Sequence, residues 1–199
     1  MTDVTGGSAA TAGDGGLLAD DAVEPVVTAS DVVFAGKVWD IKRDTFDYAG
    51  ASITREYMAH TGAVAILAID DSDRVLVIKQ YRHPIRSRDW ELPAGLLDVD
   101  GEDKLTAAKR ELAEEADLEA STWKQLVAFH TTPGGSDEMV TVFVATGVSA
   151  TGEAFDRSDE EADIELRWVA LDDVVAGVLA GRLTNSILSI AALAAAASR

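Results

Sequence analysis

The clearest structural signal in the chain is the stretch "GLLDVDGEDKLTAAKRELAEEADL", residues 95–118. Within it, Leu105, Ala108 and Leu112 recur at the i, i+3, i+7 spacing that places apolar side chains on one face of a helix. A helix of this kind buries its apolar face against a sheet or another helix. The stretch therefore predicts an amphipathic helix with one buried side.

The other side of this helix is acidic, because Glu111, Glu114 and Glu115 lie within about one turn of one another. Like charges at these spacings repel each other weakly. One interpretation is a solvated face, which is common on exposed helices. The other is a cation site, since Mg²⁺ binds through a few carboxylates together with substrate phosphates. With three His and no Cys in the chain, zinc is a poor candidate.

The surrounding residues favour the cation site, because the stretch resembles the Nudix box, G-x5-E-x7-R-E-U-x-E-E-x-G-U, where U is aliphatic. The upstream segment "WELPAG" strengthens this resemblance, which covers roughly residues 60–198. The positions that match at the family's spacing are Glu102, Arg110, Glu111, Leu112, Glu114, Glu115 and Leu118.

The two ends of the predicted helix depart slightly from the family pattern. Gly95 lies one residue too far upstream of Glu102, and Asp117 replaces the final Gly. Asp is one of the few residues that tolerate the left-handed conformation just past a helix end, so we expect an intact helix. At the other end, Asp103 or Thr106 is expected to cap it.

Nudix enzymes hydrolyse a nucleoside diphosphate linked to another moiety, with Mg²⁺ or Mn²⁺. By this resemblance, Glu111 and Glu115 are expected to be metal ligands, with Glu114 as a third. The backbone carbonyl of Ala94 would complete the site. The cation would neutralise the pyrophosphate and lower the pKa of a bound water.

Further catalytic roles also follow from the resemblance. Arg110 would orient the glutamates, and Glu102 would fix the preceding loop against the helix. Relatives also carry a Glu on a loop before a late strand, which orients or deprotonates the attacking water. The acidic segment "DRSDEEADIE" offers Glu161 for this role, with Glu160 second. Its other acidic residues are expected to be solvated.

The loop "TTPGGSDE", which contains Pro133, resembles the ADP-ribose pyrophosphatase branch of the family, most closely its actinobacterial members. The resemblance implies hydrolysis of ADP-ribose to AMP and ribose 5-phosphate. Alternatives are another nucleotide sugar or dinucleotide, such as ADP-glucose or NADH, or a non-catalytic ADP-ribose sensor. Regulators of the last kind usually add a basic DNA-binding domain, for which this acidic chain has no room.

Four residues outside the box are candidates for substrate binding. Trp39 would stack on the adenine, although a core aromatic is an equal alternative. Arg55 and Arg82 match positions that contact phosphates or the terminal ribose in relatives, and the arginine fork grips phosphate well. Arg55 could also be a plain surface charge. Glu138 could approach the substrate or a metal from its loop.

The expected fold class is α/β, a Nudix α/β/α sandwich with a mixed sheet over residues 61–199. Residues 1–25 are rich in Gly, Ala, Thr and Asp and are expected to form a disordered tail. Residues 26–60 read as a small antiparallel strand meander, which usually needs a partner surface. In relatives such strands cross to a second subunit, so we expect a homodimer with a swapped meander.

The composition argues against several classes of binding partner and cellular location. A net charge of -18 repels nucleic acid and anionic membranes. The N-terminus lacks the pattern of a secretory signal. The longest apolar stretch, which begins at Ser186, is too short to span a membrane. The sequence thus predicts a cytoplasmic protein.

Overall fold

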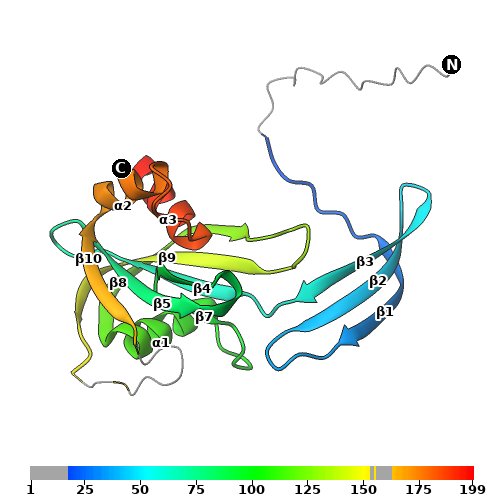
Figure 1. Ribbon diagram of the computed structural model, residues 1–199, viewed down its shortest axis with the longest axis horizontal. Helices are drawn as coiled ribbons and strands as arrows, with labels where there is room; N and C mark the ends of the chain where they lie inside the picture. The colour runs from blue at the N-terminus through cyan, green and yellow to red at the C-terminus, as the bar shows by residue number, and fades with distance from the viewer. Residues whose placement is uncertain (1–17, 153–154, 156–162) are drawn as a thin grey trace.

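The computed structural model describes residues 18–152, 155 and 163–199 (Figure 1). Its elements form three sheets in the strand orders β1-β2-β3, β10-β5-β6 and β7-β4-β9-β8. In chain order the elements are β1 (Val26–Phe34), β2 (Asp40–Tyr48), β3 (Ala51–Ala59), β4 (Ala63–Ala68), β5 (Arg74–Arg82), η1 (His83–Ile85), β6 (Ser87–Glu91), β7 (Ala94–Leu96), α1 (Lys104–Ala116), β8 (Leu118–His130), β9 (Met139–Ala150), β10 (Glu165–Ala170), α2 (Leu171–Leu179) and α3 (Ser186–Ala197).

The central strand β4 is covered by helices on both faces. Its alternate residues point to opposite sides. Ala65 and Leu67 join the apolar core beneath α2 and α3, whereas Val64 and Ile66 join the core beneath α1. The strand runs parallel to β9 and antiparallel to β7, so the sheet is mixed. The predicted α/β/α sandwich is confirmed, and Figure 1 shows α1 on one side of β4 and β9 and α3 on the other.

Strands β4 and β5 follow each other across the turn "DSD" but do not pair as a hairpin. The two strands belong to different sheets, and only an isolated bridge between Ile69 and Val75 joins them. Each strand finds its partners further along the chain: β9 for β4, and β10 for β5. The strands were recognisable from local sequence, but their pairing depends on distant segments.

Both ends of α1 are set by aspartates. The side chain of Asp103 accepts hydrogen bonds from the backbone N–H groups of Leu105 and Thr106. This settles the N-cap in favour of Asp103 over Thr106. Asp117 adopts the left-handed conformation, with φ 54° and ψ 35°, as expected for a residue replacing Gly. The helix therefore ends where the Nudix box predicts, without its glycine.

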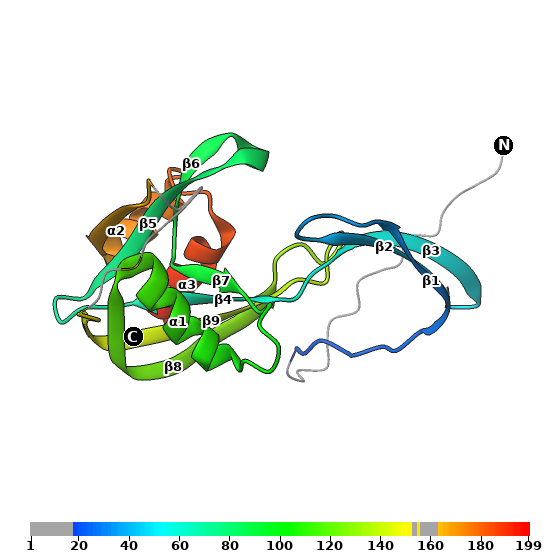
Figure 2. The same cartoon turned by 90° about the horizontal axis from the view of Figure 1, so that it is seen from below.

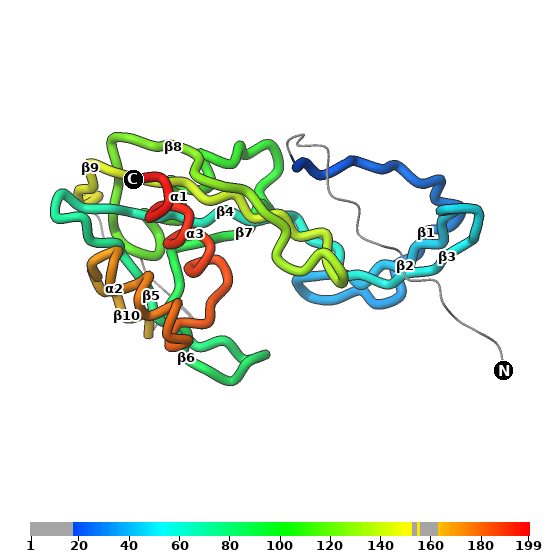
Figure 3. The backbone as a smooth tube through the Cα atoms, turned by 90° about the horizontal axis from the view of Figure 1, so that it is seen from above, coloured from blue at the N-terminus to red at the C-terminus, as the bar shows by residue number. Residues whose placement is uncertain are grey.

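The antiparallel sheet β1-β2-β3 stands apart from the rest of the molecule (Figures 1, 2 and 3). Its β2–β3 turn is at Ala49 and Gly50, both with positive φ. All nine residues of β1 are exposed. Backbone contact with the body is made near Met58, whose N–H donates to the carbonyl of Gly135. This sheet thus lacks a core of its own.

The helices within the described part of the chain are all too short or too polar to cross a membrane.

Candidate active site

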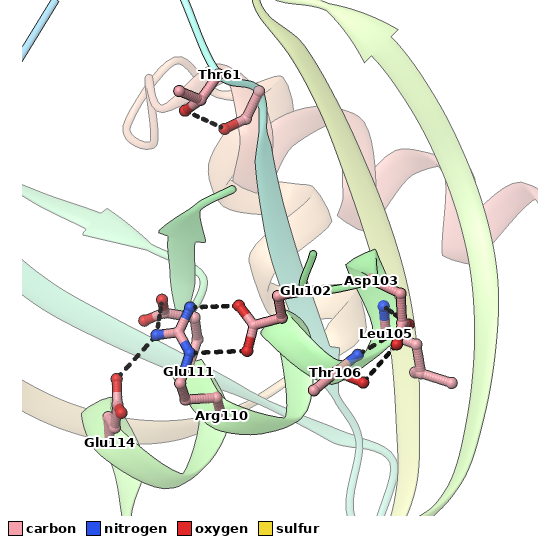
Figure 4. Close-up of polar contacts among 9 residues, drawn as sticks. Thr61, Glu102, Asp103, Leu105, Thr106, Arg110, Glu111 and Glu114 are labelled. Carbon is pink, nitrogen blue, oxygen red and sulfur yellow. Dashed lines mark hydrogen bonds and ion pairs between the residues drawn. The ribbon is translucent and has the colours of Figure 1, made fainter. Parts of the chain in front are cut away.

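A single guanidinium organises the acidic side of α1 (Figure 4). Arg110 binds Glu102 through two hydrogen bonds, Nε to Oε1 at 3.1 Å and Nη2 to Oε2 at 3.0 Å. Its Nη1 donates to Glu111 at 2.6 Å and to Glu114 at 3.1 Å. The hydrogen bonds to Glu102, followed by the charge of Glu111, raise the pKa of Arg110 above its ordinary value. The repulsion between the helix carboxylates is thereby offset within the chain itself.

Glu115 is held separately from this cluster. Its side chain is buried, with the residue only 4% exposed. One carboxylate oxygen accepts a hydrogen bond of 2.8 Å from the backbone N–H of Ala94, the first residue of β7. A charge-assisted bond of this kind is short and directional. It fixes the last turn of α1 against the segment that precedes the Nudix loop.

Gly95 lets the backbone approach the glutamates. A Cβ added at this residue would lie 2.0 Å from both Cδ and Oε1 of Glu111, so the Glu111 side chain would have to leave its position. The glycine therefore lets Glu111 keep its present position, even though its spacing to Glu102 departs from the family pattern. The resemblance identified this residue as out of register, and the structure supplies the reason for its presence.

The donor set suits a hard divalent cation. Glu111, Glu114 and Glu115 supply carboxylate oxygens from one helix, and Gly95 leaves room for the Glu111 carboxylate beside β7. Among residues 18–152, 155 and 163–199, no three His, Asp or Glu side chains are gathered closely enough to enclose a metal. Glu111 and Glu114 instead bind Arg110, and the Ala94 N–H binds Glu115.

Arg82 is engaged by a buried carboxylate. Its Nε and Nη2 donate to the two oxygens of Glu91 at 2.9 and 2.7 Å, and Glu91 is 5% exposed. Side chains alternate along β5, so Arg82 lies on the same side of the strand as Leu76, which packs in the α1 core. Arg82 is thus on the α1 side of the molecule and held in one orientation.

Trp39 and Glu138 are brought together by His60. The Trp39 ring stacks on the His60 ring at 5.6 Å, and His60 Nε2 lies 3.5 Å from a carboxylate oxygen of Glu138. The His60 side chain is only 3% exposed. Trp39 itself is 41% exposed, so its ring is not buried within this chain. Glu138 also accepts a hydrogen bond from the Thr131 hydroxyl.

The structure does not place the other predicted site residues beside these side chains. Arg55 is exposed on β3, and its guanidinium donates to the neighbouring carbonyl of Thr54. Glu160 and Glu161 lie outside the described residues. The sequence reasoning overlooked His60 and Glu91 as organising residues. Glu91 could have been noticed as the acid of "WELPAG", whereas nothing local distinguishes His60.

Comparisons with known proteins agree with this geometry. The NUDIX domain matches residues 59–188. Over 167 residues the chain is 44% identical to the ADP-ribose pyrophosphatase of Mycobacterium tuberculosis, covering 83% of this chain and 80% of that protein. It is 36% identical over 154 residues to the ADP-ribose pyrophosphatase of Bacillus subtilis, covering 77% and 82% respectively.

A solved structure described as an ADP compounds hydrolase superposes with a TM-score of 0.73 over 90% of this chain and 96% of that chain. At 17% sequence identity, this match shows a shared fold. The chain belongs to the Nudix family and is a Nudix hydrolase. The resemblance drawn from the sequence is confirmed.

Proposed function

We propose that this enzyme hydrolyses ADP-ribose to AMP and ribose 5-phosphate with the help of a divalent cation. The observation that carries the proposal is the α1 carboxylate set, held by Arg110 and by the Ala94 N–H beside β7. Two relatives that align over most of their length are named ADP-ribose pyrophosphatases, which favours this substrate over ADP-glucose or NADH.

We propose that Glu111, Glu114, Glu115 and the Ala94 carbonyl hold Mg²⁺ or Mn²⁺. When bound, the cation supplies charge neutralisation of the pyrophosphate and a more acidic water. The chain's own residues prepare for it. Arg110 holds Glu111 and Glu114 beside each other through its Nη1, and Glu102 keeps Arg110 in place through two hydrogen bonds.

Substrate recognition would involve both regions of the molecule. Trp39 rests on His60 yet remains 41% exposed, which suits stacking on an adenine ring. Arg82 is oriented by Glu91 on the α1 side and could contact a phosphate or the terminal ribose. Arg55 and Glu138 are further candidates, Arg55 from the N-terminal sheet and Glu138 from the loop that contacts it.

We also propose a homodimer formed through residues 26–60, with the N-terminal sheet exchanged between subunits. The support is the exposed apolar surface of β1 and its surroundings, including Val26, Val32 and Phe34. Such surface on a soluble protein marks an interaction site. A cytoplasmic location fits a nucleotide-sugar substrate, and the net charge of -18 argues against nucleic acid and membrane partners.

The test of substrate is a panel of ADP-ribose, ADP-glucose and NADH, each with Mg²⁺, Mn²⁺ or EDTA, with products separated by chromatography. We expect AMP and ribose 5-phosphate from ADP-ribose at the highest kcat/KM, and no turnover in EDTA. Faster hydrolysis of ADP-glucose or NADH would overturn the substrate assignment while leaving the hydrolase class intact.

The proposed general base is Glu161, and Glu160 provides the matched control. Glu161→Gln should lower kcat by about 10²- to 10⁴-fold, the usual contribution of a general base, with little change in KM. Glu160→Gln should be much milder. If Glu160→Gln is the impaired variant, the role moves by one residue. If neither loses more than a few-fold, the base lies elsewhere, with Glu114 and Glu138 next.

A further inference from the structure

A cavity of 320 Å³ lies between the sheet β10-β5-β6 and the helices α2 and α3. It is on the opposite side of the sheet from α1. Val77, Val174 and Leu188 line it and belong to the core beneath α2 and α3, whereas Leu76, the neighbour of Val77 on β5, belongs to the core beneath α1. The cavity is therefore separate from the Nudix carboxylates.

The cavity has an apolar floor and an aromatic wall. Its floor comes from valines and leucines of β5, β10, α2 and α3, and its wall is the half-buried Trp90 of β6. The Arg167 guanidinium lies 4.8 Å from the centroid of the Trp90 ring, and the Lys79 ammonium lies 5.2 Å from it. These cations hold the indole in place by cation–π attraction.

The charge around the cavity is opposite to that of the whole protein. Two arginines, Arg167 and Arg182, line it against one carboxylate, Asp173. Arg167 is paired with Glu165 at 2.8 Å. In the part of the chain that the structure describes, Lys79 and Arg182 make neither an ion pair nor a side-chain hydrogen bond. Cations without carboxylate partners are unexpected in a chain with a net charge of -18.

Arg182 is placed at the cavity by the end of α2. Its backbone N–H donates to the carbonyl of Gly177 at 2.9 Å. Gly177 lines the cavity, and a Cβ there would lie 2.8 Å from Leu183 Cδ1 and 4.0 Å from Arg182 Nη2. The missing side chain thus lets Leu183 and the guanidinium fold closely over the helix. The turn after α2 therefore places Arg182 in the cavity wall.

We propose that this cavity binds a small aromatic anion, an aromatic ring that carries a phosphate or carboxylate. The apolar floor and Trp90 would take the ring, and Arg182 would take the negative group, because guanidinium forms strong charge-assisted hydrogen bonds with such groups. Its volume is near the lower end of the roughly 300–1,000 Å³ typical of ligand sites, which suits one ring system with one anionic group.

The experiment uses the full-length protein in EDTA, so that the probe cannot bind through a metal at α1. The probe is 1-naphthyl phosphate, titrated by calorimetry and by ¹H–¹⁵N NMR, with 1-naphthol and inorganic phosphate as controls. We expect one saturable site per chain, weaker binding of both controls, and shifts at the Trp90 indole and the Gly177 amide. Trp90→Phe assigns the indole signal.

Two matched arginine variants locate the charge contact. Arg182→Gln should weaken binding about tenfold or more, the value of losing a hydrogen bond to a charged group. Arg86→Gln, at an exposed arginine in the connection between β5 and β6 that does not line the cavity, should leave the affinity unchanged. Both side chains are exposed, so both variants should fold, and circular dichroism verifies this.

Three results would overturn the proposal: no saturable binding, equal affinity for 1-naphthol, or unchanged affinity in Arg182→Gln. Binding that is lost in Arg82→Ala but retained in Arg182→Gln would place the probe on the α1 side and would equally refute the site. None of these outcomes bears on ADP-ribose hydrolysis, which is measured with metal present.

Discussion

Strands β1 and β4 both contain apolar residues, but the two strands differ in burial. β4, "AVAILA", is buried at every residue, whereas β1, "VVTASDVVF", is exposed at every residue. β4 has strands on both sides and helices over both faces, while β1 pairs only with β2 at the edge of its sheet. The comparison teaches that apolar residues in a strand do not by themselves decide whether the strand is buried within the chain.

The body of the molecule and the N-terminal sheet also differ in the interactions that stabilise them. The body has two apolar cores, each bringing together residues distant in sequence. The N-terminal sheet relies on backbone pairing and on contacts of Met58 and His60 with the 135–138 loop. A small isolated sheet is at best marginally stable in water. This is the physical basis for proposing that a second subunit covers it.

The largest expected effect comes from placing a charge in each strand. Ile66→Asp should prevent folding, because Ile66 is fully buried and an unpaired buried charge costs several kcal/mol of a total stability of about 5–15 kcal/mol. Val32→Asp, at a half-exposed position on β1, should leave the body folded but weaken the dimer. Circular dichroism and light scattering measure both effects. A Val32→Asp protein that stays fully dimeric would contradict the proposed interface.

The next effect is confined to the body of the molecule and should reduce catalytic activity without changing the fold. Glu115→Gln should reduce kcat/KM by more than about 100-fold, beyond the usual cost of losing a residue that merely supports a metal ligand. Its stability should change little, because the amide oxygen of Gln can still accept the Ala94 N–H. Kinetics at saturating Mg²⁺ and a denaturation curve test the two parts. Near-normal turnover would remove Glu115 from the proposed metal site.

Substituting one arginine in each region compares how much a charged side chain contributes to stability there. Arg82→Ala should lower the free energy of unfolding by about 1–3 kcal/mol, because Glu91 would stay buried without its bidentate partner. Partial exposure of Arg82 keeps the cost below that of a fully buried pair. Arg55→Ala should change stability by less than about 0.5 kcal/mol, as is usual for surface positions. Urea denaturation measures the difference, and equal losses would refute it.

The smallest expected effect is a pH-dependent one at Asp89 of β6. Burial, with a further contribution from Glu91, raises the pKa of Asp89, although a hydrogen bond with Asn185 opposes the shift. The folded protein therefore holds this proton more tightly, and stability falls as pH rises from the unfolded pKa through the folded one. Asp89→Asn should be more stable than the original at neutral pH, with the gain disappearing in acid. Melting curves against pH check this, and a gain that grows in acid would have the wrong sign.

Much of the site could be predicted from sequence because its information is local. Arg110, Glu111 and Glu114 share one helix, so their contacts follow from helical geometry once Asp103 and Asp117 mark its ends. The strands were recognisable for the same reason, since alternation and apolar runs are read within a few residues. The Nudix spacing added the contact with Glu102 across the preceding loop.

Only the tertiary structure decided which distant segments of the chain pair with one another. Examples are the separation of β4 from β5, the capture of Arg82 by Glu91, and the stacking of Trp39 on His60. Each depends on which strands become neighbours and on how far each side chain is buried. Those outcomes depend on the total apolar surface that the whole chain buries on folding. No short stretch of sequence determines that total.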